Sequence, residues 1–321
     1  MPERSSFWWS FHPIKCFPSS YCMYYISFSS TFAPMIYLLL SILSSTAIAV
    51  IFKLMDRQKV ALLPVIVLNY FSAFAAGFLL FKGTPSLAYI LNSDWLYIAI
   101  VIGSLLIIGF YLIGYTTQKA GIAITTIANK MSVIIPISFS IFYFAEPMSF
   151  LKAIGIVLAL ISVLLAVYKK KQVEKSRFSL LPIIMFLVVG IIDATVKLAQ
   201  HSYVSEEDVS LFTSLSFGLA GIIGITSMAI QNKQWRSFTS SRVWIYGILI
   251  GLANFGSIYF LILALNHSAL DSSIVYGVNN MGIILISIGL AVAFFTERLS
   301  KLNLLGVIFA LISIAILTIW I

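Results

Sequence analysis

The chain has 321 residues, of which 60% are hydrophobic and only 10% are charged, and its formal net charge is +9 at pH 7. A soluble domain carries roughly 25% charged residues, so water is not the solvent for most of this surface. The basic residues sit in short gaps between apolar segments rather than on a polar domain, which argues against nucleic-acid binding. The mean hydropathy of +1.03 predicts an integral membrane protein.

Ten segments have the length and composition of membrane-spanning helices, which need about 20 mostly apolar residues. These runs are continuously apolar rather than alternating, so helices are favoured over a β-barrel. Several are separated by only a few residues, which predicts antiparallel packing of consecutive helices. The expected fold is therefore an all-α polytopic membrane protein with helices at about 35–54, 60–81, 95–117, 121–144, 149–168, 180–200, 209–230, 242–266, 270–295 and 300–321.

The second half of the chain repeats the first. Residues 144–165 read FAEPMSFLKAIGIVLALISVLL, and residues 294–316 read FFTERLSKLNLLGVIFALISIAI. Each copy has five predicted helices, an odd number, so the copies are expected to enter the bilayer from opposite sides as inverted repeats, with a binding site where they meet. Further matches pair Lys53-Leu54 with Lys197-Leu198, Ser72–Gly77 with Ser216–Gly221, and Asn129-Lys130-Met131 with Asn279-Asn280-Met281.

This repeat divides the chain into a first five-helix copy at 35–170, a basic linker at 171–179 and a second copy at 180–321. Residues 1–34 stand outside this plan, and they lack the charged start and compact apolar core of a cleaved signal. They are either a dispensable extension, with Met35 at the first helix, or an interfacial anchor rich in aromatic residues. Both cysteines, Cys16 and Cys22, lie here at a spacing that fits no zinc site.

The distribution of Lys and Arg predicts an orientation. Of the 20 such residues, 13 lie in the loops after helices 1, 3, 5, 7 and 9, and four lie on the other side. By the positive-inside rule, the basic loops face the cytoplasm and both termini face out.

These features resemble the drug/metabolite transporter (DMT) superfamily, specifically its EamA-like permeases. The resemblance covers residues 35–321 and rests on FAEPMSFLKAIGIVLALIS and FFTERLSKLNLLGVIFALIS. It implies a bacterial inner-membrane carrier for metabolites, amino acids, nucleotide sugars or drugs that works by alternating access. Many such carriers keep both termini inside, in contrast to the charge count. Related small multidrug exporters use a glutamate in their first helix, where the ionisable group here is Lys53.

Lys130 is the deepest charged residue, about nine residues into the fourth predicted helix. A charge at the bilayer centre costs about 2.5–3.5 kcal/mol on insertion scales, so such residues are candidates for function. Asn129 lies beside Lys130, and Pro136 follows, where its missing N–H can kink the helix. Lys130 is expected to bind substrate in a water-filled cavity; the alternative is an amine satisfied by nearby carbonyls.

Two further lysines, Lys53 and Lys197, lie near the C-terminal ends of helices 1 and 6. Their alternative role is snorkelling, in which the amine reaches the headgroups. Asp193 precedes Lys197 by four residues, so both lie on one helical face and are expected to pair. In this hypothesis an anionic substrate competes with Asp193 for Lys197, or Asp193 takes up a coupling proton. Three lysines against one aspartate favour an anionic or carboxylate-bearing substrate.

Other polar residues at mid-helix depth complete the expected binding site, although each could simply join helices at about 0.6–2 kcal/mol. Two loop glutamates, Glu146 and Glu297, have a charge that suits a helix N-terminus and are interpreted as structural. The remaining candidate ligands of the substrate are Asn69, Tyr70, Tyr111, Tyr276, Asn279 and Asn280.

Enzyme chemistry finds little support, because no histidine pair has metal spacing and no Gly-rich loop binds phosphate. No cofactor is expected. The chain is predicted to be a monomeric or homodimeric secondary-active transporter of a small polar metabolite, such as an amino acid or organic anion. Proton coupling, sodium coupling or exchange would drive it. Open alternatives are a flippase for a lipid-linked intermediate, a multidrug exporter, an intramembrane enzyme, and a structural or receptor protein without transport.

Overall fold

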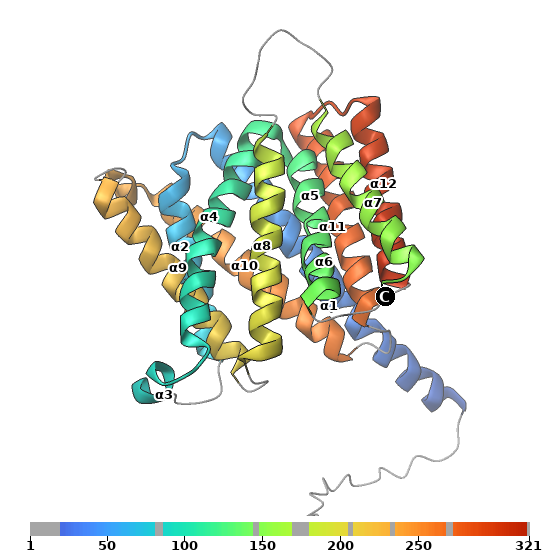
Figure 1. The fold of residues 1–321 in the computed structure, drawn as a ribbon, viewed down its shortest axis with the longest axis horizontal. Coiled ribbons are helices and arrows are strands. Elements are labelled where there is room, and N and C mark those ends of the chain that lie inside the picture. Colours follow the sequence, from blue (N-terminus) through green and yellow to red (C-terminus); the bar gives the residue numbers. More distant parts are fainter. Residues whose placement is uncertain are drawn as a thin grey trace, which may run out of the picture.

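The computed structural model describes residues 20–80, 86–143, 148–168, 180–204, 208–231, 235–267 and 272–319. Figure 1 shows that these residues form one bundle of helices running up and down. The elements are α1 (Ser20–Arg57), α2 (Leu62–Leu80), α3 (Leu87–Leu91), α4 (Leu96–Ala120), α5 (Ile122–Met131), α6 (Ile134–Tyr143), α7 (Phe150–Val167), α8 (Leu181–Ser202), α9 (Val209–Gln231), the 3-10 helix η2 (Trp235–Thr239), α10 (Ser241–His267), α11 (Ser272–Phe295) and α12 (Lys301–Ile319).

The helices have the dimensions of membrane spans. Within the described residues, nine segments are long and apolar enough to cross a bilayer, and the shorter apolar helix Phe150–Ala166 is a tenth candidate. One of the nine, Ile122–Tyr143, contains both α5 and α6. The predicted all-α, multi-pass membrane architecture is therefore confirmed, and the observed helices follow the predicted segments closely.

The fourth predicted span differs from expectation because it is two helices rather than one. The break falls at Ser132 and Val133, just ahead of Pro136. Proline has no N–H to offer the carbonyl of Ser132 four residues earlier. That carbonyl instead accepts from the N–H of Ile135 at 2.9 Å, a tighter turn that ends α5 at Met131.

The first helix also differs, because it starts at Ser20 rather than near residue 35. Pro34 lies inside α1, where it removes one backbone donor without ending the helix. At 1.5 Å per residue, the 38 residues of α1 span about 57 Å, well beyond the bilayer core of about 30 Å. Its blue N-terminal part accordingly projects from the bundle in Figure 1. The rest of the predicted extension, residues 1–19, lies outside the described residues.

Two hydrophobic cores hold the bundle together. One is built mainly by α5, α7, α8 and α12, with Ile127, Met131 and Met185 fully buried. The other is built mainly by α1, α2, α9 and α10 around Phe52 and Tyr70. Close helix contacts depend on glycine: a Cβ added at Gly251 of α10 would lie 2.7 Å from the Asn69 carbonyl oxygen in α2.

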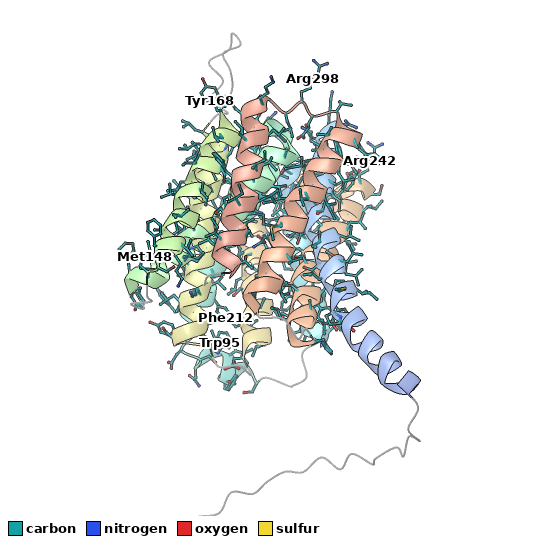
Figure 2. All side chains as sticks on the ribbon, turned by 90° about the vertical axis from the view of Figure 1, so that its right-hand side faces the viewer. Trp95, Met148, Tyr168, Phe212, Arg242 and Arg298 are labelled. Atoms are coloured by element: carbon teal, nitrogen blue, oxygen red, sulfur yellow. The ribbon has the colours of Figure 1, made fainter. Side chains whose placement is uncertain are left out.

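The bundle has two chemically different ends. Figure 2 places Tyr168, Arg242 and Arg298 at one end and Trp95 and Phe212 at the other. We call these the Arg298 end and the Trp95 end. Arg57 lies at the Arg298 end, with its guanidinium 4.6 Å from the ring centre of Phe295. Three basic residues that the sequence places on one side, Arg57, Arg242 and Arg298, thus lie at the Arg298 end.

Candidate functional site

A cavity of about 170 Å³ lies between the two hydrophobic cores. Its walls come from five spans: α1, α4, the half-helix α5, α10 and α11. Helices α1, α4 and α10 contribute from one core, and α5 and α11 contribute from the other. The lining residues are Ser45, Ile48, Ala49, Phe110, Ile113, Thr125, Thr126, Asn129, Lys130, Asn254, Ser257 and Ile283.

Lys130 and Asn129 line the cavity from the last turn of α5. Lys130 lies eight residues beyond Ile122, which places it roughly 12 Å along the helix axis and near the middle of a 30 Å bilayer core. A helix C-terminus carries partial negative charge on its unpaired carbonyls, which favours a cation in the last turn. Because Pro136 ends α5 early, that favourable end is brought to mid-membrane depth, where the Lys130 charge would otherwise be costly.

Lys130 has an acidic neighbour in the second half of the chain. The Asp193 carboxylate of α8 interacts electrostatically with Lys130, and the Ser132 side chain is within hydrogen-bonding reach of it. Asp193 is at the same time exposed, although it sits near the middle of a membrane span. The sequence predicts Lys197 as a partner of Asp193; the structure adds Lys130, from another helix, as a charged neighbour of this carboxylate. Ionisable residues within membrane spans are rare, and they usually pair with one another or mark a functional site.

Several buried polar side chains lie in or beside the cavity wall. Asn254 is 9% exposed and donates its amide N–H to Asn69 Oδ1 at 3.3 Å. Among the described residues, Nδ2 of Asn69 has no hydrogen-bond partner. Thr126 is 5% exposed and lines the cavity. Since buried polar groups are normally hydrogen-bonded, these side chains are well placed to bind a polar solute or water.

The rest of the wall is apolar. Ile48, Phe110, Ile113 and Ile283 contact the same space as the polar groups. A few polar groups set in a largely apolar wall are the usual composition of a small-molecule site, in which the polar groups orient the ligand.

The predicted asparagines lie in or beside this site. Asn69 is fully buried, and its Oδ1 accepts the hydrogen bond that orients the Asn254 amide. Asn279 is 4% exposed, and its Oδ1 has no partner among the described residues. It lies one helical turn before the lining residue Ile283, and the half-buried Asn280 follows it. All three are therefore close to the cavity without being part of its described lining.

Two other predicted ligands form hydrogen bonds to neighbouring helices in the structure. Tyr70 is fully buried in the α2 core, where its hydroxyl donates to the Leu106 carbonyl at 2.6 Å. Lys53 donates its amine to the carbonyl of Gln118 at 3.3 Å, in the last turns of α4. Each side chain thus donates a hydrogen bond to a carbonyl of a neighbouring helix, and neither is among the residues that line the cavity.

The remaining predicted ligands lie outside the described lining as well. Tyr111 is 39% exposed and stacks on Tyr115, with ring centres 6.0 Å apart. Tyr276 is 48% exposed on α11, and Lys197 is half-buried one turn beyond Asp193.

The cavity also contains residues that the sequence did not single out. Asn254 lies in the middle of α10, and an asparagine at that depth could have been found by the same reasoning as Asn69. Ser45, Thr126 and Ser257 gave no such signal, because serine and threonine are common in membrane helices, where they often bond to their own backbone.

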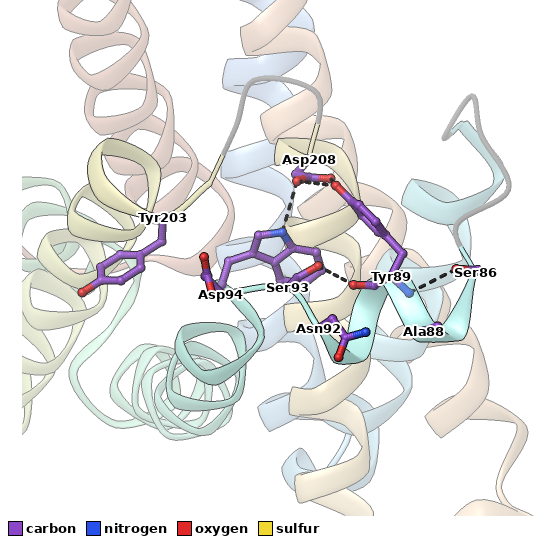
Figure 3. A pocket seen from close by; sticks show the side chains of 9 residues that line it. Ser86, Ala88, Tyr89, Asn92, Ser93, Asp94, Tyr203 and Asp208 are labelled. Carbon is purple, nitrogen blue, oxygen red and sulfur yellow. Dashed lines mark hydrogen bonds between the residues drawn. The ribbon is translucent and has the colours of Figure 1, made fainter.

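A second, shallower pocket of about 550 Å³ lies at the Trp95 end (Figure 3). Its Asp208 carboxylate accepts hydrogen bonds from the Tyr89 hydroxyl at 2.8 Å and from Trp95 Nε1 at 3.2 Å. These bonds hold the short helix α3 against the start of α9. We therefore interpret the acidic group of this pocket as structural.

The helices and the buried cavity define a multi-pass α-helical membrane protein. An uncharacterized protein of Haemophilus influenzae is 32% identical over 284 residues, covering 86% of this chain and 95% of the relative, and the chain belongs to the same family as that protein. A search of protein-family profiles finds no match. A solved crystal structure of another protein shares the fold, with a TM-score of 0.56 at 14% identity over 91% of this chain and 99% of its own.

Proposed function

We propose that this chain is a secondary-active transporter of a small polar metabolite, built as an EamA-like permease of the drug/metabolite transporter superfamily. The observation that carries the proposal is the cavity at the broken fourth span, where Lys130 reaches mid-membrane depth. Transporters characteristically place substrate sites near the bilayer midplane, beside discontinuous helices. The Asn254 amide and the Lys130 amine in the wall of this cavity support a binding role over a purely structural one.

The helix contacts support two inverted five-helix repeats. If α1 corresponds to α8, α2 to α9, α4 to α10, α5 and α6 to α11, and α7 to α12, each contact should have a counterpart. The contact of α1 with α10 corresponds to that of α8 with α4, and the contact of α2 with α10 corresponds to that of α9 with α4. The contact of α1 with α11 corresponds to the contacts of α8 with α5 and α6. Two further contacts, α2 with α9 and α7 with α12, each join a helix to its own counterpart in the other repeat.

The size of the cavity favours a small solute. Pockets for drug-sized ligands hold roughly 300–1,000 Å³, whereas this cavity holds about 170 Å³. Among the functions compatible with the fold, this volume supports metabolite transport over multidrug export or the flipping of a lipid-linked intermediate.

The charges indicate how a solute would bind. A carboxylate on the substrate would compete with Asp193 for the Lys130 amine, and the Asn254 and Thr126 oxygens would accept hydrogen bonds from its donor groups. Release of Asp193 would leave an acid that is free to take up a coupling proton. The two hydrophobic cores would then rock about the cavity and open it to one face at a time.

A ligand screen tests this function. Purified protein in detergent is heated with a panel of carboxylic acids, amino acids and nucleotide sugars, and the unfolding temperature is recorded. At least one small carboxylate-bearing solute should raise it, since a ligand that binds only the folded state stabilises that state. Lys130→Met should abolish the rise, while Lys301→Met, which removes an exposed lysine at the start of α12, should leave it intact. A wild-type protein that no member of the panel stabilises would contradict the proposal.

A further inference from the structure

Glu297 connects the loop after α11 to the start of α5. Its carboxylate oxygens accept hydrogen bonds from the backbone N–H groups of Ile122 at 2.8 Å and Ala123 at 3.2 Å. The first N–H groups of a helix have no partners within the helix, and its N-terminus carries partial positive charge. The sequence predicts that the Glu297 charge suits the N-terminus of the helix that follows it in the chain, α12. It instead caps the half-helix that carries Lys130, in the other half of the chain.

The backbone on both sides of this contact is shaped to permit it. Gly121 precedes α5 with a φ of +98°, and a Cβ at this position would lie 2.8 Å from the Glu297 carboxyl atoms. Thr296 has a φ of 54°, a left-handed conformation that is unfavourable for a β-branched residue. Strained residues of this kind persist where the surrounding structure requires them, often at switching sites.

A hydrophobic seal surrounds the Glu297 contact. Ile122, Ala123, Ala291 and Phe295 form a buried cluster against which Ala49 packs, and Ala49 is also part of the cavity wall. Along α5, the cluster residues precede Thr126 by about one turn. The cluster therefore lies between the cavity and the Arg298 end, and no other layer of α5 separates the two.

We propose that Glu297 is the latch of a gate that closes the cavity toward the Arg298 end and that positions α5 for ligand binding. The latch joins α11 to α5, so opening this end requires the two hydrogen bonds of Glu297 to break. Because α5 is only ten residues long, the same contact fixes the helix on which Thr126, Asn129 and Lys130 line the cavity. Glu297 thus acts on the site through α5 without touching the ligand. This inference rests on the proposed function, because it assumes that the cavity opens to each face of the membrane in turn.

The latch is tested by asking from which face the cavity can be reached. Both native cysteines are replaced in a Cys16→Ser/Cys22→Ser background, and Thr126→Cys is introduced as a reporter in the cavity wall. A membrane-impermeant maleimide is applied to right-side-out and to inverted vesicles. Exposed end markers, Arg242→Cys and Asp94→Cys, show which bundle end each vesicle presents.

In the parent protein, labelling of the reporter from the Arg298 end should be at least tenfold slower than labelling of the Arg242→Cys marker. Glu297→Ala should accelerate reporter labelling from this end about tenfold. Glu297→Gln, which retains one acceptor oxygen, should give an intermediate rate. Gly121→Ala should reproduce Glu297→Ala, because the added methyl group displaces the carboxylate. Arg298→Ala, a change at the exposed neighbouring residue, should leave the rate unchanged.

Reporter labelling from the Arg298 end that is fast in the parent protein, or equal in the parent and all three latch variants, would overturn the latch. Three different variants are used so that poor folding of one cannot decide the result. The measurement needs no transported solute. If the latch variants accelerate reporter labelling but no solute stabilises the protein, the gate is supported and the transport proposal is contradicted. If a solute stabilises the protein but the variants leave the labelling rate unchanged, the transport proposal is supported and the gate is contradicted.

Discussion

Lys130 of α5 and Asp193 of α8 interact electrostatically across the boundary between the two halves of the chain. An acidic and a basic group that lie together can neutralise each other in a region where a single charge is costly. The pair therefore has two separable roles: it makes an intramembrane lysine tolerable, and it offers an amine that a substrate carboxylate can bind in place of Asp193. Variants that remove one or both charges distinguish these roles.

Loss of the amine alone should destabilise the protein. Lys130→Met leaves Asp193 without its cationic neighbour, at an expected cost of about 1–3 kcal/mol. This is less than the ~3–5 kcal/mol of breaking a fully buried pair, because the Ser132 side chain remains within hydrogen-bonding reach of the Asp193 carboxylate. Adding Asp193→Asn should restore much of the loss, which a double-mutant cycle of unfolding free energies in detergent would measure. Strictly additive effects of the two substitutions would contradict the pairing.

Tyr70 should matter for stability but not for ligand binding. Tyr70→Phe removes the hydrogen bond to the Leu106 carbonyl while keeping the ring contacts with Phe110 and Phe217. The expected loss is about 0.5–1.5 kcal/mol of unfolding free energy. Solute affinity should stay within twofold of wild type, and Tyr111→Phe, at an exposed ring, should change neither quantity. A large drop in affinity for Tyr70→Phe would return this residue to the binding site.

Two glycine substitutions should have opposite effects. In Gly251→Ala the new methyl group would lie 2.5 Å from Ser72 Cβ and 2.7 Å from the Asn69 carbonyl oxygen, so α10 must move away from α2. Overpacking of this kind costs roughly 1–3 kcal/mol. Gly289→Ala meets nothing within 4 Å and should gain about 0.5–1 kcal/mol from helix propensity. Unfolding temperatures of the two variants would check the contrast, which fails if both shift in the same direction.

The sequence predicted the spans well because membrane length and hydropathy are properties of one segment at a time. It also indicated a disturbance at Pro136, since the missing N–H acts on its own helix. The start of α1 was predicted less well. The helix was predicted to start near residue 35, yet Pro34 inside it removes only one hydrogen bond, and the helix extends back to Ser20.

Sequence reasoning could not predict contacts between residues that are far apart in the chain. Spacing along one helix suggested Lys197 for Asp193, and it could not reveal Lys130, which is distant in sequence and adjacent only in the fold. The same holds for Glu297, whose partners lie 174 and 175 residues earlier in the chain. Thr126 gave no signal because its hydroxyl is distinctive only by facing a cavity.

Solute counterflow in proteoliposomes tests the central claim most directly. Vesicles that contain purified protein are loaded with an unlabelled solute found in the ligand screen, and entry of the labelled solute is followed. Wild type should accumulate label transiently, because a carrier that exchanges solute across the bilayer traps label inside until the gradient decays. The charge-neutral variant Lys130→Met/Asp193→Asn should show an initial rate at least tenfold lower. A solute that binds yet shows no counterflow with wild type, or equal rates with both proteins, would contradict a carrier working through Lys130.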